Sequence, residues 1–200
     1  MDNYALQAAA ARRRCLTYDQ DALIRKFHLQ ADKDRLYWTL LSRPYRIGRQ
    51  DGRLEKKIGD AWVPADSHGE IMTLFDILCD AADNRSLSGQ FQLMENFGHG
   101  FHRSLAEDHP SPEVLLFDRE PEVFIRGCEA MGGVKAGRGD LSYRTELADG
   151  LPVLLEFWHS DEDFPPQLKF FWDLNSLQYL KYETMWYAAG LILERITESL

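Results

Sequence analysis

A histidine and several carboxylates gather near the end of an apolar segment in the last quarter of the chain. Such side chains bind hard or borderline divalent cations, and a histidine beside a carboxylate can act in general acid–base chemistry. The alternative is a solvated loop whose acidic side chains keep the turn in water while the Phe-Pro-Pro run at 164–166 anchors it on the core. The spacing matches neither an EF-hand nor a zinc signature. These polar candidates are His159, Asp161, Glu162, Asp163 and Asp173.

A glycine-rich stretch precedes this region. From Gly132 to Gly139 it also carries Lys135 and Arg138, so its backbone N–H groups and cations can wrap an anion. It stands before a predicted strand and lacks the residue order of a phosphate loop, so a flexible connection is the other interpretation. Asp140 ends the stretch and joins the polar candidates if both segments reach the same end of one sheet.

Aromatic residues make up 12% of the chain, which favours a well-packed core or an aromatic-lined groove. We expect such a groove to hold a small ligand or a partner peptide. Its candidate residues are Trp158, Trp172, Tyr182 and Trp186.

A third group of polar residues contains histidines. His99 and His102 share a face only if their segment is helical, which the neighbouring Gly98 and Gly100 oppose, and His109 lies further on. Metal binding and ordinary surface imidazoles are the two interpretations.

Signatures of several site classes are missing from the sequence. We find neither a Gly-x-Ser-x-Gly elbow nor a dinucleotide fingerprint. Cys15, Cys79 and Cys128 form no Cys-x-x-Cys pair, so we expect no metal or iron–sulfur site built from them. Their odd number, with no signal peptide in residues 1–20, predicts a cytoplasmic protein. No apolar run is long enough to predict a membrane span.

The charge balance bears on the partners of the chain. A formal net charge of −9 repels a phosphate backbone, so we expect no nucleic-acid partner. The basic cluster Arg12–Arg14 ends an alanine-rich helical pattern, where cations favour the helix dipole, and phosphate binding is its alternative role.

Periodicity in the first two thirds of the chain predicts helices around an antiparallel meander. Thr17 with Gln20 resembles a capping box that opens a helix. Period-two alternation over 35–58, with Asp51-Gly52 as a hairpin turn, indicates paired strands. We further expect helices over 3–14, from 66 or 67 to about 82, from 111, and from 121 to the glycines at 132–133, with a short strand at 91–93.

The last third positions most of the candidate residues. Residues 141–147 alternate as a strand does, and 153–158 and 168–172 are apolar on both faces, as central strands are. Residues 176–197 form a final helix that is apolar nearly all round, so it is either central or meets a second subunit in a homodimer. The sequence thus predicts one α+β domain over 1–200: an antiparallel sheet flanked by helices, with the long C-terminal helix packed on it.

Several of these motifs occur in the order of a known family. The chain resembles the prokaryotic domain of unknown function 3786 family, common in anaerobes, over about residues 1–198. The acidic Phe-Pro-Pro stretch is the most specific match. The others are Gly132-Gly133, Gly139-Asp140, Trp158, the strand ending in Asp173, Tyr179-Leu180, Glu183, and Leu87-Ser88-Gly89-Gln90-Phe91 after the helix at 71–82.

The resemblance implies kinship of fold and assigns no activity. Some relatives are fused to iron–sulfur modules or encoded near corrinoid enzymes, which points to anaerobic one-carbon or redox metabolism; this chain lacks the clustered cysteines of such a module. Two functional hypotheses follow, with the cofactor left open. One is a non-catalytic accessory module that binds a ligand or partner; the other is a metal-assisted hydrolase that uses the acidic loop at 159–163.

Overall fold

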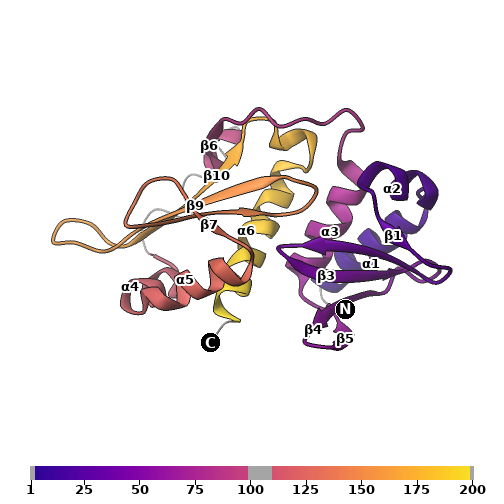
Figure 1. Ribbon diagram of the computed structural model, residues 1–200, viewed down its shortest axis with the longest axis horizontal. Helices are drawn as coiled ribbons and strands as arrows, with labels where there is room; N and C mark the ends of the chain where they lie inside the picture. Colours follow the sequence, from indigo (N-terminus) through magenta and orange to yellow (C-terminus); the bar gives the residue numbers. More distant parts are fainter. Residues whose placement is uncertain (1–2, 99–109, 199–200) are drawn as a thin grey trace. The chain divides into compact units, whose positions relative to one another are not determined.

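The computed structural model describes residues 3–98 and 110–198. By its internal contacts the chain divides into two compact units. Unit 1 contains the described residues up to Ser86 together with Leu177–Leu191, and unit 2 contains those from Leu87 to Ser176 and from Ile192 onward. Figure 1 traces the chain through both units. The expectation of a single domain over 1–200 stays a prediction.

Unit 1 contains a five-stranded antiparallel sheet in which the strands follow chain order. Tyr45 and Ile47 point from this sheet into the core, where Leu74 and Phe75 of a helix are also buried. The predicted meander is therefore confirmed, and it extends further in both directions than predicted. The strands are β1 (Gln30–Ala31), β2 (Arg35–Leu40), β3 (Arg43–Gly48), β4 (Leu54–Ile58) and β5 (Ala61–Pro64), and the helices are α1 (Asn3–Leu16), α2 (Gln20–Phe27) and α3 (His68–Asp80).

The start of α2 differs from its prediction. Asp19, and not Thr17, is the N-cap, because its carboxylate accepts the N–H groups of Asp21 and Ala22. The Thr17 hydroxyl donates instead to the carbonyl of Arg14 at 2.7 Å and so belongs to the end of α1.

Unit 2 contains a second antiparallel sheet, in the order β6-β10-β9-β8-β7. The two predicted central strands, β9 and β10, are indeed central. On one face Phe157 of β9 packs against Phe117 and Phe124 of two helices, which Figure 1 shows along that side of the sheet. The strands are β6 (Phe91–Leu93), β7 (Val134–Lys135), β8 (Leu141–Glu146), β9 (Pro152–Trp158) and β10 (Gln167–Asp173); the helices are α4 (Pro112–Arg119), α5 (Pro121–Ala130) and the short η1 (Met94–Phe97).

The C-terminal helix α6 (Tyr182–Thr197) begins later than the predicted 176. The short helix η2 (Ser176–Gln178) precedes it, and the Gln178 carbonyl accepts the N–H of Ala82 at 2.7 Å, so it is not available to a continuous helix. Near the end of α6, Ile196 packs directly on Gly127 of α5.

The predicted α+β fold, with a C-terminal helix packed on antiparallel strands, is confirmed. The single predicted sheet proves to be two. Among the described helices none is long and apolar enough to cross a membrane.

Candidate functional site

The acidic loop after β9 is largely solvent-exposed. The Asp161 carboxylate accepts the N–H groups of Asp163 and Phe164 at 2.9 and 2.7 Å, so this residue closes a local turn. The side chains of Glu162 and Asp163 are exposed. Of the Phe-Pro-Pro run at 164–166 that could anchor the loop, the Phe164 side chain is 63% exposed, and Pro166 is the buried residue.

His159 is held at the end of β9 by two carboxylates. Its Nδ1 lies 2.9 Å from Oδ1 of Asp118 at the end of α4, and its backbone N–H donates to Oδ2 of Asp140 at 2.8 Å. Asp118 also accepts the N–H and hydroxyl of Ser160, and these hydrogen bonds, with the one from His159, lower the pKa of its carboxyl. The glycine-rich stretch thus brings Asp140 to the acidic loop, and both acids fasten the loop's first residues.

Asp173 is fully buried and points to a different segment. Its carboxylate accepts the N–H groups of Ser88, Gly89 and Asn175 and the hydroxyl of Ser88, at 2.7 to 3.0 Å. All four donors come from the loops next to β6 and β10, so the side chain fastens the chain and leaves little acceptor capacity for a ligand.

The polar candidates therefore do not meet at a common point. Within residues 3–98 and 110–198, no three His, Cys, Asp or Glu side chains are placed to share a metal ion. His99, His102 and His109 lie outside the described residues. The geometry that a metal-assisted hydrolase at 159–163 needs is not present in the described part.

The face of the unit 2 sheet opposite α4 and α5 carries a different set of side chains. In an antiparallel sheet, directly paired residues share a face. Glu156 of β9 pairs with Lys169 of β10 and with Ser142 of β8, and Leu154 pairs with Phe171. Phe171 in turn pairs with Leu93 of β6. This face therefore combines half-buried apolar residues with the buried carboxylate of Glu156.

A hollow of about 480 Å³ opens on this face. Glu156 lines it and is only 6% exposed. The volume falls in the range of small-molecule sites. The lining residues are Phe91, Gly137, Arg138, Leu154, Glu156 and Phe171, and we call this hollow the Glu156 pocket.

The Glu156 carboxylate is incompletely satisfied. Among the described residues, the single hydrogen bond to it comes from the backbone N–H of Arg138, 2.9 Å from Oε1. Lys169, its cross-strand neighbour, forms no ion pair with it; the ammonium lies 5.1 Å from the centre of the Trp158 ring. A carboxylate can accept about four hydrogen bonds, so a buried one with a single donor can receive more from a ligand.

Gly137 sets the depth of the pocket. Its φ of +80° favours glycine, and a Cβ there would lie 2.8 Å from Glu156 Oε1 and 2.9 Å from Leu154 Cδ1. Because glycine has no side chain, the Glu156 carboxylate is not covered, and the backbone N–H of Arg138 can reach it.

The chain matches the family described as Domain of unknown function (DUF3786) over residues 19–195. The chain belongs to the DUF3786 family. No curated protein and no solved structure matches it.

Two of the motifs that resemble the family have a structural role in this DUF3786 chain. The Ser88-Gly89 amides and the strand-ending Asp173 bind each other directly, and Asp140 binds His159 at the end of the apolar strand. These contacts join loops to strands within unit 2.

The four aromatic candidates divide between the two units, and the two in unit 2 lie on opposite faces of its sheet. Trp172 pairs with Val153 and is 0% exposed, so it is a core residue on the sheet face opposite Trp158. Trp158 is half-buried on the face that carries Glu156. Tyr182 and Trp186 belong to unit 1, where their rings lie edge to face at 6.2 Å.

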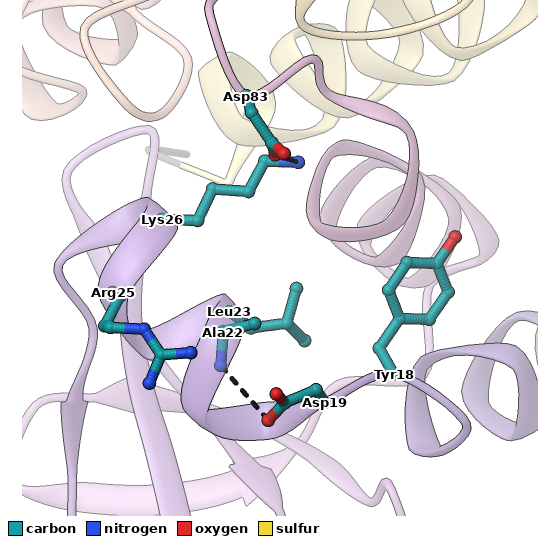
Figure 2. A pocket seen from close by; sticks show the side chains of 7 residues that line it. All are labelled: Tyr18, Asp19, Ala22, Leu23, Arg25, Lys26 and Asp83. Carbon is teal, nitrogen blue, oxygen red and sulfur yellow. Dashed lines mark hydrogen bonds and ion pairs between the residues drawn. The ribbon is translucent and has the colours of Figure 1, made fainter.

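Unit 1 has a hollow of its own, of about 600 Å³ (Figure 2). Two of its charged groups are engaged: Asp19 caps α2, and Lys26 extends to Asp83, with 2.9 Å between Nζ and Oδ1. It is lined by Tyr18, Asp19, Ala22, Leu23, Arg25, Lys26 and Asp83. We see no buried unsatisfied charge among them, so the Glu156 pocket is the stronger candidate.

Arg14 and Glu70 of unit 1 are also paired. Arg14 forms ion pairs with Asp80 and, at 3.8 Å, with Asp76, which supports a structural role for this member of the basic cluster. Glu70 is buried, and its carboxylate accepts hydrogen bonds from the Tyr45 hydroxyl at 2.7 Å and from Lys56 Nζ at 3.0 Å.

Two residues that matter here were not singled out from the sequence. Glu156 is the one acid in the apolar run of β9. A single charged residue in a strand that is apolar on both faces is unusual, and this could have singled Glu156 out. Asp118 lies at the polar end of a helix, and no local sequence pattern distinguishes it, because its partners His159 and Ser160 are 41 and 42 residues away.

Proposed function

We propose that this protein is a non-catalytic binding module whose ligand places a cationic N–H group on Glu156 and an apolar body against Phe91, Leu154 and Phe171. The observation that carries the proposal is the buried Glu156 carboxylate, which has one backbone donor and forms no ion pair among the described residues. The half-buried rings at the rim supply an apolar wall.

Energetics favour a cationic ligand over a neutral one. Taking a carboxylate out of water costs several kcal/mol unless a counter-charge or hydrogen bonds offset it. A ligand ammonium supplies both, and a charge-assisted hydrogen bond contributes about 1.5–3 kcal/mol. A neutral ligand of the same shape gains only the apolar contacts.

Calorimetric titration with 2-phenylethylamine and its uncharged analogue 2-phenylethanol tests this. We expect the amine to bind and the alcohol to bind at least about tenfold more weakly. Glu156→Gln keeps the shape and the acceptor for the Arg138 N–H but removes the charge, so the amine should lose that advantage. Glu162→Gln, on the exposed loop, is the matched control and should bind like the parent protein.

Equal affinity for amine and alcohol, or amine binding that survives Glu156→Gln, would overturn the proposal. Circular dichroism of each variant separates a binding defect from a folding defect.

The wider setting is also part of the proposal. We propose a cytoplasmic accessory protein without a nucleic-acid partner, with a link to anaerobic one-carbon or redox metabolism based on its family alone. A homodimer stays a prediction, although burial of Met185, Ala188 and Ile192 within the chain weakens the helix argument for it. Analytical ultracentrifugation measures the oligomeric state.

A further inference from the structure

We infer that the ligand of the Glu156 pocket is a free α-amino acid with an apolar side chain. This inference rests on the proposed binding of a cationic group by Glu156 and adds a second contact, to a ligand carboxylate. The groups that carry it are Arg138 and Lys169, which stand beside Glu156 and have no acidic partner among the described residues.

Arg138 reaches the pocket from the glycine-rich loop. Its backbone N–H is fixed on Glu156 Oε1, while its exposed side chain lines the hollow. No carboxylate in the described part of the chain pairs with its guanidinium. A guanidinium presents paired N–H donors that match a carboxylate.

Lys169 offers a second cation from β10. Its Cα is paired with that of Glu156, so the two side chains leave the same face side by side, about 5 Å apart at Cβ. Its ammonium nevertheless lies over the half-buried Trp158 ring, a contact that contributes about 0.5–2 kcal/mol. A charge-assisted hydrogen bond to a ligand carboxylate contributes about 1.5–3 kcal/mol, so the ammonium can exchange the ring for the ligand.

Glu156 lies beside two cations, Arg138 and Lys169, and forms an ion pair with neither. Such an arrangement can bind a zwitterion, which carries both charges. In an α-amino acid one carbon separates the ammonium from the carboxylate, so adjacent protein groups of opposite charge can bind both at once. The ammonium meets Glu156, the carboxylate meets Arg138 or Lys169, and the third substituent faces the apolar wall of Phe91, Leu154 and Phe171.

Other ligand classes satisfy less of the site. An apolar carboxylic acid without an amine meets the repulsion of the buried Glu156 charge. A plain amine leaves both cations unused. An internal peptide residue has neither free terminus, so the geometry favours the free amino acid.

The test compares three ligands that share one phenyl group: L-phenylalanine, 2-phenylethylamine and N-acetyl-L-phenylalanine. For the parent protein we expect L-phenylalanine to bind about tenfold more tightly than the amine, since one charge-assisted contact is worth about that factor. N-acetyl-L-phenylalanine, which lacks the ammonium, should bind more weakly than both.

Variants then assign the second contact. The double variant Arg138→Gln with Lys169→Met should lose the preference for L-phenylalanine over the amine and keep amine binding. Arg126→Gln, an exposed arginine on α5, is the control for loss of a positive charge and should keep the preference.

The outcomes separate the two proposals. Amine binding that depends on Glu156, with no gain for L-phenylalanine, overturns the amino-acid inference and leaves the proposed function standing. A preference that persists in the double variant also overturns the assignment to Arg138 and Lys169. If neither L-phenylalanine nor 2-phenylethylamine binds, both proposals are overturned.

Discussion

Asp173 binds Ser88 twice, through the backbone N–H and through the hydroxyl, although the two residues are 85 positions apart. The same carboxylate also accepts hydrogen bonds from the backbone N–H groups of Gly89 and Asn175. One buried side chain thus fixes the entry to β6 and the exit from β10. Since Phe91 of β6 lines the Glu156 pocket, this contact also supports one wall of the proposed site.

Replacing this carboxylate should destabilise the protein strongly. Asp173→Asn keeps the shape but places an NH₂ group beside an N–H donor and removes the charge. We therefore expect the free energy of unfolding to fall by about 2–4 kcal/mol. Urea denaturation followed by tryptophan fluorescence measures this. Asp163→Asn, on the exposed loop, makes the same chemical change and should alter stability by less than about 0.5 kcal/mol. Similar losses in the two variants would contradict the assigned role.

The same contact predicts a pH dependence with a definite sign. Burial alone raises the pKa of Asp173, but the hydrogen bonds from Ser88, Asn175 and Gly89 outweigh it, so the pKa lies below its ordinary value. The stabilisation is therefore present above the unfolded pKa of about 3.9 and is lost as the pH falls toward the native pKa. The difference in unfolding free energy between parent and Asp173→Asn should be constant from about pH 7 to 5 and shrink below about pH 4. A difference that grows on acidification would show that the charged form is not the stabilising one.

Periodicity predicted the strands well because a half-buried strand must alternate its side chains. It did not predict two sheets, since alternation says which face of a strand is apolar and not which strands pair. The turn at Leu41-Ser42 shows a further limit. Both residues have positive φ, 49° and 58°, yet neither is typical of such a turn, and Leu41 is 1% exposed. Burial of the leucine offsets a conformation that the local sequence does not favour.

The candidate site was harder to predict than the fold for a related reason. The acidic residues at 161–163 are conspicuous in the sequence because they are exposed and clustered. Glu156 stands alone between apolar residues, and its importance depends on Lys169 and Arg138, which only the sheet register and the glycine loop bring near. Long-range pairing of this kind has no local pattern.

Helix packing in unit 2 gives a prediction with a matched control. A Cβ at Gly127 of α5 would lie 2.5 Å from Ile196 Cα, so Gly127→Ala forces the end of α6 away. We expect it to destabilise the protein by about 1–3 kcal/mol despite the higher helix propensity of alanine. Gly190→Ala on α6 has open space around its Cβ and should stabilise by roughly 0.5–1 kcal/mol. Thermal unfolding of both variants checks the pair, and a stabilising Gly127→Ala would refute this close packing.

Gly137 and Gly150 separate backbone strain from loss of the pocket. Both have positive φ, +80° and +75°, so alanine at either position costs about 1–2 kcal/mol of conformational strain. A Cβ at Gly150 meets no atom within 4 Å, whereas one at Gly137 lies 2.8 Å from Glu156 Oε1 and also crowds the Ser142 hydroxyl. Gly137→Ala should therefore be the less stable variant in urea and should weaken 2-phenylethylamine binding at least about tenfold. Gly150→Ala should bind the amine like the parent protein. If Gly137→Ala binds the amine with unchanged affinity, the ligand does not reach the Glu156 carboxylate beside this glycine, and the site must lie elsewhere.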